Sequence, residues 1–196
     1  LDLDELSQRV ASLVLETFGY YYVALFTLEP DQETLLCRAS AGPLQPENGR
    51  LPSETFAPSV ELGQGIVGHV AKTGEEILAG DVSRDSHYRY VDVLPETKSE
   101  AALPLRIKER TLGVLDVQSD QPERFDETDV LVLRALADQI AIAVEDARLY
   151  GDLRLHADQL SAVAEVSRVV ASILDLDELL DRVAALVIVV AIAKTG

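Results

Sequence analysis

A long helical pattern constrains the fold of this chain more than any other feature, because it runs from Phe125 and Asp126 to about Leu174. At about 1.5 Å per residue, these roughly 49 residues would extend about 70 Å, more than one small domain can cover. From residue 149 onward, mostly apolar positions recur every four and three residues, as in a coiled coil. These positions, which we call the seam, are Leu149, Leu153, His156, Leu160, Val163, Ser167, Val170 and Leu174. We expect a parallel homodimer along the seam; the alternative is that the stripe folds back on its own domain through a break at Gly151.

The residues before this helix predict an α/β (α+β) fold. Residues 2–18 have apolar positions at helical spacing, and Gly19 ends the pattern. Residues 20–28 and 34–41 are rich in aromatic and β-branched residues around a turn, which predicts a hairpin. A second hairpin, at 101–107 and 111–118, is almost continuously apolar and predicts central strands. The other expected elements are a loop at 42–58, a short helix at 66–73, a brief strand at 76–78 and a mixed loop-helix region at 79–97.

The opening helix recurs near the end of the chain. Residues 1–14 match residues 174–187 at 11 of 14 positions, with a shift of 173 residues. Such a repeat is typical of tandem modules. We therefore expect a first domain at 1–150, a linker helix at 151–174 and the start of a second, incomplete copy at 175–196.

Charge and cysteine content exclude several classes of protein. There are 17 lysines and arginines against 34 aspartates and glutamates, a net charge of −17, which disfavours binding to nucleic acid or to an anionic membrane surface. The longest uncharged apolar run, residues 183–193, is far shorter than the ~20 residues of a membrane span. A single cysteine and no leader pattern favour the cytoplasm. The absence of methionine indicates a piece of a larger protein, whose output domain we expect to be a partner.

Several segments together resemble the GAF domain family, the ligand-sensing modules of proteins such as sensor histidine kinases. These segments are Leu62-Gly-Gln-Gly-Ile-Val-Gly-His-Val-Ala-Lys-Thr-Gly74, Ala101-Ala-Leu-Pro-Leu105, Leu112-Gly-Val-Leu115, Phe125-Asp126 and Leu136-Ala-Asp-Gln-Ile-Ala-Ile-Ala-Val144. The resemblance covers about residues 1–150. It implies a central antiparallel sheet with the terminal helices on one face and a pocket, roofed by residues 79–97, on the other. It also implies a non-catalytic sensory and regulatory role.

The expected pocket roof gathers charges, aromatic rings and hydrogen-bond donors into one short stretch, residues 81–90, which suits the orientation of a small polar ligand. The predicted ligand contacts are Asp81, Arg84, His87, Tyr88, Tyr90 and Ser99. The alternative is that these residues have structural roles and that the protein is a connector and dimerisation domain without a ligand.

The sequence lacks the residues with which specialised GAF domains bind their known ligands. Residues 81–92 lack the Asn-Lys of cyclic-nucleotide-binding members, and they lack the cysteine that anchors a bilin. The histidines His69, His87 and His156 are far apart in sequence, and none has a metal-ligand spacing, so neither heme nor a metal is predicted. The Gly-x-Gly-x-x-Gly at 63–68 lacks a βαβ context and predicts a turn. The small methionine sulfoxide reductases that share the fold use cysteines, and Cys37 alone, on a predicted strand, argues against an enzyme.

Overall fold

The structure is a computed structural model that describes residues 3–43 and 59–195. It divides into two compact units, Leu1–Arg148 and Leu149–Gly196. The loop expected at 42–58 lies, apart from its first two residues, outside the described residues. In the part of the chain that is described, no helix is long and apolar enough to cross a membrane.

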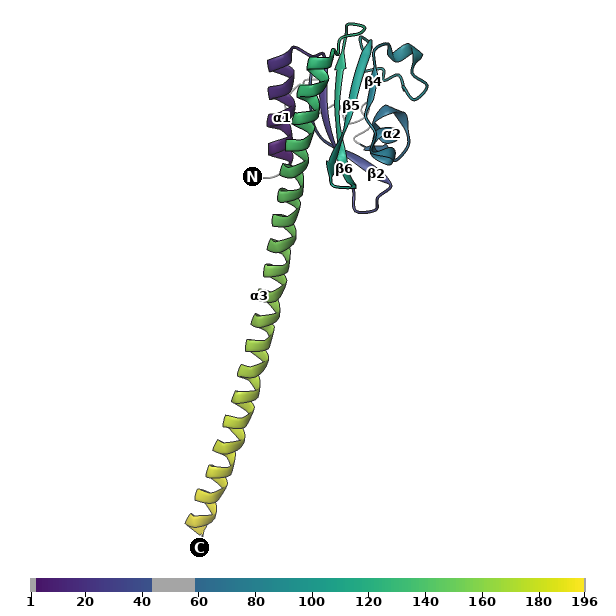
Figure 1. The fold of residues 1–196 in the computed structure, drawn as a ribbon. Helices are drawn as coiled ribbons and strands as arrows, with labels where there is room; N and C mark the ends of the chain where they lie inside the picture. The colour runs from purple at the N-terminus through teal and green to yellow at the C-terminus, as the bar shows by residue number, and fades with distance from the viewer. Residues whose placement is uncertain (1–2, 44–58, 196) are drawn as a thin grey trace. The chain divides into compact units, whose positions relative to one another are not determined.

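The first unit is built on an antiparallel sheet of six strands in the order β3-β2-β1-β6-β5-β4. Figure 1 labels β2, β4, β5 and β6 of this sheet. The strands are β1 (Tyr22–Leu28), β2 (Thr34–Ala41), β3 (Ser59–Glu61), β4 (Ile77–Ala79), β5 (Ser99–Ile107) and β6 (Arg110–Ser119). The helices are α1 (Leu3–Phe18), α2 (Gly65–Thr73), a single 3-10 turn at Val82–Arg84, and α3 (Glu127–Thr195). Both predicted hairpins and the predicted α/β class are confirmed.

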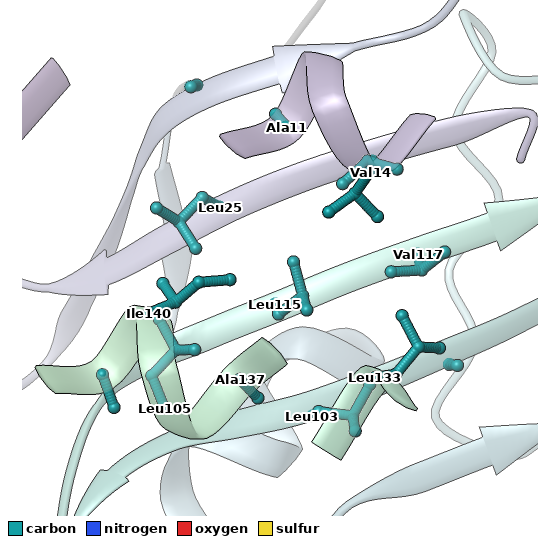
Figure 2. Close-up of a cluster of buried hydrophobic side chains, with 14 of the residues drawn as sticks. Ala11, Val14, Leu25, Leu103, Leu105, Leu115, Val117, Leu133, Ala137 and Ile140 are labelled. Carbon is teal, nitrogen blue, oxygen red and sulfur yellow. The ribbon is translucent and has the colours of Figure 1, made fainter. Parts of the chain in front are cut away.

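One face of the sheet packs against α1 and the first part of α3. Side chains alternate between the two faces of a strand, so Leu115 and Val117 of β6 point to this side together with Leu25 of β1. They meet Ala11 and Val14 from α1, and Leu133, Ala137 and Ile140 from α3, as Figure 2 shows. This packing confirms the expectation that the terminal helices share one face.

The opposite face is covered by α2 and by the segment after β4 (Figure 1). Here Tyr22 and Phe26 of β1 pack with Ile66 and Val70 of α2 and with Leu94 of the following segment. Because both faces are covered, the central strands are apolar almost throughout, as the sequence indicated.

One predicted boundary was wrong: the helix does not end near Leu174 but continues to Thr195. The alternative, a break at Gly151, is absent, because Gly151 lies inside α3. A single glycine costs a helix only about 1 kcal/mol, and helix-forming neighbours outweigh that cost. Residues 174–187 repeat the helical pattern of α1, so they extend the helix.

Strand β3 was also missed. The sequence of β3 does not predict a strand, because the strand has only three residues and only the middle one, Val60, is half-buried. The strand exists through its pairing with β2, in which Val60 lies opposite Leu35.

Gly113 marks the closest approach of two central strands. A Cβ atom at Gly113 would lie 2.0 Å from the carbonyl oxygen of Phe26 on β1. We expect Gly113→Ala to lower the free energy of unfolding by about 1–3 kcal/mol, because the two strands would have to move apart. Urea denaturation measures the effect. The control is Gly151→Ala, where a Cβ meets no atom within 4 Å and stability should stay equal or rise. Equal losses in both variants would contradict the close approach.

Candidate functional site

A cavity of about 400 Å³ lies on the α2 side of the sheet. Its floor comes from β1, β5 and β6, and its walls come from β3, the start of α2 and the segment after the 3-10 turn. The lining residues are Tyr22, Phe26, Ser59, Val60, Glu61, Gln64, Gly65, Ile66, Val67, Tyr88, Arg89, Val91, Leu94, Glu100, Asp116 and Gln118. The volume falls within the range of natural small-molecule sites.

The floor of the cavity carries buried polar side chains. In β6, Asp116 and Gln118 alternate with Leu115 and Val117, so the polar pair points into the cavity while the apolar pair packs under α1 and α3. Glu100 on β5 lies opposite Gln118 in the strand register, and therefore on the same face. The exposed fractions of Glu100, Asp116 and Gln118 are only 4%, 2% and 8%.

A chain of hydrogen bonds fixes the orientation of these groups. The hydroxyl of Thr97 donates to Oε1 of Gln118 at 2.7 Å, and Nε2 of Gln118 donates to Oδ2 of Asp116 at 2.8 Å. The other oxygen of that carboxyl, Oδ1, is buried, and when Glu100 is charged it has no hydrogen-bond donor among the described residues; a protonated Glu100 donates to Asp116. An unpartnered buried oxygen at a cavity is a point at which a ligand could donate.

Burial also changes the acidity of the pair. Burial raises the pKa of Glu100 well above its ordinary value, and the charge of the neighbouring Asp116 raises it further. Burial likewise raises the pKa of Asp116 to about 6, although hydrogen bonds from Gln118 and from Glu100 oppose the rise. Burial therefore favours the protonated state of this pair.

Of the residues predicted to contact a ligand, Tyr88 lines the cavity, and so does its neighbour Arg89. Asp81 instead caps the 3-10 turn: its Oδ1 accepts from the backbone N–H of Ser83 at 3.0 Å and from the Ser83 hydroxyl at 2.6 Å. Arg84 is exposed and forms an ion pair with Asp81 at 3.1 Å. These contacts build the local turn.

The remaining predicted residues do not line the cavity either. Nδ1 of His87 lies 3.2 Å from Oδ1 of Asp85, and the centroid of the His87 ring lies 4.0 Å from that of the His69 ring, with the two rings tilted by 41°. Tyr90 is 64% exposed, and the hydroxyl of Ser99 donates to the carbonyl of Gln121 at 2.7 Å. A ligand role for these residues remains a prediction.

The fold brings His69 and His87 together although they are distant in the sequence. Even so, no group of histidine, cysteine and acidic residues able to hold a metal ion occurs among the residues that the structure describes.

Sequence reasoning missed Glu100, Asp116 and Gln118. The signal that could have found them is the alternation in residues 114–118, where polar Asp116 and Gln118 interrupt an otherwise apolar central strand. A buried strand that places an aspartate and a glutamine at alternate positions points to a function for that face.

The glycine-rich segment forms a turn, as the sequence predicted. The backbone N–H of Gly63 donates to the carbonyl of Gly68 at 2.8 Å. A Cβ at Gly68 would lie 2.4 Å from the carbonyl oxygen of Glu61, so the glycine is required by packing.

Cys37 is half-buried on β2, and its Sγ lies 3.5 Å from the carbonyl oxygen of Ala39. Burial, followed by the charge of Asp116, raises the pKa of its thiol to about 12. Because the thiolate is the reactive form, we expect Ellman's reagent to modify Cys37 in the folded protein at least about 100-fold more slowly than in urea. Equal rates in the two conditions would show that Cys37 is accessible and activated.

Comparison with known proteins identifies the family. The GAF domain family model matches residues 1–145. The chain is 31% identical over 113 residues to the dual 3',5'-cyclic-AMP and -GMP phosphodiesterase 11A of Takifugu rubripes, covering 55% of this chain but 12% of that protein. It is 26% identical over 121 residues to GAF domain-containing protein A of Dictyostelium discoideum, covering 62% and 68%. The chain thus spans only about an eighth of the length of the phosphodiesterase.

Solved structures share the fold. The free methionine-R-sulfoxide reductase of Neisseria meningitidis, solved in complex with its substrate, has a TM-score of 0.65 and 26% identity, over 76% of this chain and 81% of that one. The GAF domain of the Acinetobacter phosphoenolpyruvate-protein phosphotransferase has a TM-score of 0.64 and 21% identity, over 78% and 87%. These neighbours include an enzyme as well as GAF domains without a stated activity. Since the family model covers well over half of the sequence, the chain belongs to the GAF domain family, whose members are mostly non-catalytic sensory and regulatory modules.

Proposed function

We propose that this chain is the sensory and dimerisation module of a cytoplasmic signalling protein, such as a sensor histidine kinase. It binds a small molecule in the cavity on the α2 side of the sheet and passes the state of that cavity to an output domain through α3. The module itself is not an enzyme in this proposal. Family membership supports the sensory role.

The observation that carries the proposal is the cavity with its buried polar floor. A structural connector gains nothing from carboxyl groups buried beside an unfilled volume, because burial of a polar group without a full set of partners destabilises the fold. Glu100 and Asp116 are both almost completely buried at that volume. A ligand that satisfies them offsets the cost.

Strand β6 alone separates the cavity from α3, because its side chains alternate between the two faces of the sheet. Asp116 faces the cavity, and its neighbour Leu115 packs in the cluster that includes Leu133 and Ile140 of α3. A ligand that shifts β6 therefore acts directly on the residues that hold α3 to the sheet. Such a shift requires a helix pair with two packing arrangements, which a dimer along the seam would provide.

Dimerisation is supported by the exposed apolar residues of the second unit. Leu149, Leu153, Leu160 and Val163 are 48%, 65%, 71% and 63% exposed in the single chain, and His156 between them is also exposed. A parallel partner helix would cover them. The side chains of the seam residues Val170 and Leu174 are not described.

In the proposed layout, residues 1–150 form the sensory domain, 151–174 the signalling helix, and 175–196 the start of a second copy. The recurrence of the α1 sequence at residues 174–187 supports the tandem arrangement, and these residues are helical within α3.

A thermal-shift screen tests ligand binding. A sensor is stabilised by RT ln(1 + [L]/Kd), about 2.7 kcal/mol at a ligand concentration one hundred times Kd, whereas a connector is unchanged. The screen should include nucleotides, nitrate, tetrapyrroles, small acids and small amines. The control is Val91→Trp, which places an indole into the cavity from its wall and should abolish the shift of any true cavity ligand. If no compound stabilises the protein, the connector is the better account.

A further inference from the structure

We propose that the cavity binds a small organic molecule carrying one positive charge, an ammonium or amidinium group held against the carboxyl groups of Glu100 and Asp116. This inference rests on the proposed sensory function and names the chemical class of its ligand.

The two carboxyl groups form one site. In the antiparallel register of β5 and β6, Glu100 lies opposite Gln118 and Ala102 lies opposite Asp116. Glu100 and Asp116 are therefore diagonal neighbours on the same face of adjacent strands, within reach of each other's side chains. Both line the cavity.

When both carboxyl groups are charged, the site has acceptors and lacks a donor. Gln118 satisfies only Oδ2 of Asp116, because its own amide oxygen is engaged by Thr97. When Glu100 is charged, Oδ1 of Asp116 has no donor among the described residues, and the Asp116 side chain is only 2% exposed. A group with several N–H donors fits this position.

The surroundings do not supply the missing charge. Among the described residues, neither Glu100 nor Asp116 forms an ion pair, and Arg89 is the only basic residue that lines the cavity; its side chain is exposed. None of the other titratable groups around the pair can carry a positive charge, because each is a carboxyl, a phenol or a thiol. These groups are Asp85, Tyr88, Tyr22, Cys37 and Glu61. Two negative charges buried side by side repel each other. The pair is therefore stable either when one carboxyl is protonated or when a cation lies against both carboxylates.

The rest of the lining defines the body of the ligand. Phe26, Ile66, Val67, Val91 and Leu94 form apolar walls around the polar floor. Such walls favour an aliphatic or aromatic body attached to the charged group.

Binding should exchange the proton for the cation. Burial and the charge of Asp116 raise the pKa of Glu100, so the pair favours holding a proton when no cation is bound. When a cation binds, both carboxyl groups become charged and the proton leaves to solvent. The ligand keeps all its own protons, so one positive charge enters and one leaves.

Isothermal titration calorimetry tests this exchange. The probes are benzamidine and phenethylamine, with the uncharged benzamide and 2-phenylethanol as matched controls, each titrated in phosphate and in Tris near pH 7. We expect at least one cation to bind, its neutral counterpart to bind at least about tenfold more weakly, and the heat to depend on the buffer as the release of about one proton requires.

Variants locate the site. Glu100→Gln and Asp116→Asn should each weaken binding at least about tenfold, and Glu100→Gln should remove the proton release. Glu109→Gln, which alters a carboxyl that is 98% exposed, should change nothing. Circular dichroism and thermal unfolding check that each variant is folded.

The possible failures are distinct. If the cations fail to bind while an anion or neutral compound from the thermal screen binds and is excluded by Val91→Trp, the cationic ligand class is wrong and the sensory function survives. Cation binding that is unaffected by Glu100→Gln and Val91→Trp also overturns this inference, because the site is then elsewhere. If nothing binds at all, both this inference and the proposed function are contradicted.

Discussion

Replacing Leu153 and Leu160 together by aspartate should convert a dimer of this chain into a monomer. In the single chain these side chains are 65% and 71% exposed. Burying a leucine contributes about 1.5–3 kcal/mol, and a twofold dimer would bury both residues in each copy. The loss of at least roughly 6 kcal/mol would weaken the dimer by about ten-thousandfold, before the repulsion between the new charges is counted. Sedimentation equilibrium measures the mass.

The matched control is Ala162→Asp. Ala162 is exposed and lies on the side of α3 away from the seam, so a charge there should leave the dimer intact. Circular dichroism should show that the sheet domain stays folded in all variants, because its core lies within the first unit. A monomeric wild-type chain, or a double variant with the mass of the wild-type dimer, would contradict the seam.

The second large effect is a loss of stability as the pH rises. Glu100 and Asp116 have pKa values above those of an exposed carboxyl, so the folded protein binds protons more tightly than the unfolded chain. Stability is therefore lost as the pH rises from the ordinary pKa values, 3.8 for Asp116 and 4.5 for Glu100, through the folded ones, which are about 6 for Asp116 and well above the ordinary value for Glu100. For Asp116 alone the difference corresponds to about 3 kcal/mol.

Glu100→Gln should remove much of this loss. Its amide resembles the protonated acid and can donate to Asp116, so the variant should be more stable than the wild type near pH 8 by up to about 3 kcal/mol. Near pH 5 the two should be close. Urea denaturation at both pH values measures the difference, with Glu109→Gln as the exposed control. A wild-type protein and a Glu100→Gln variant with parallel pH profiles would show that the pair is not protonated when the cavity is empty.

Much of the fold could be predicted because its signals are local. The first hairpin has alternating residues around a turn at Asp31, whose carboxylate accepts from the backbone N–H groups of Glu33 and Thr34. The spacing of its apolar residues predicts helix α1, which ends at Phe18, directly before Gly19 with its positive φ of 66°. Strand β3 carries no such signal, because only its pairing with β2 makes it a strand.

The site was harder to predict, for a related reason. The residues at 81–90 attract attention because their charges are adjacent in sequence, yet Asp81 and Arg84 mainly stabilise their own turn. The polar floor of the cavity is dispersed over two strands, and Glu100 meets Asp116 only through the β5–β6 register. The strand register brings together side chains that are far apart in the sequence. The only local sequence signal of the polar floor is the alternation of polar and apolar residues in β6.

The central claim, that the occupant of the cavity changes the packing along the seam, is tested most directly by the distance between spin labels in the dimer. The single cysteine simplifies the experiment: Cys37→Ser removes it, and Ala157→Cys supplies an exposed site beside the seam. Double electron–electron resonance should give one distance between copies for the empty protein and a shifted distance when the ligand retained from the thermal screen saturates the cavity. The shift should be absent in Val91→Trp. The same distance distribution with and without a saturating ligand would contradict the account.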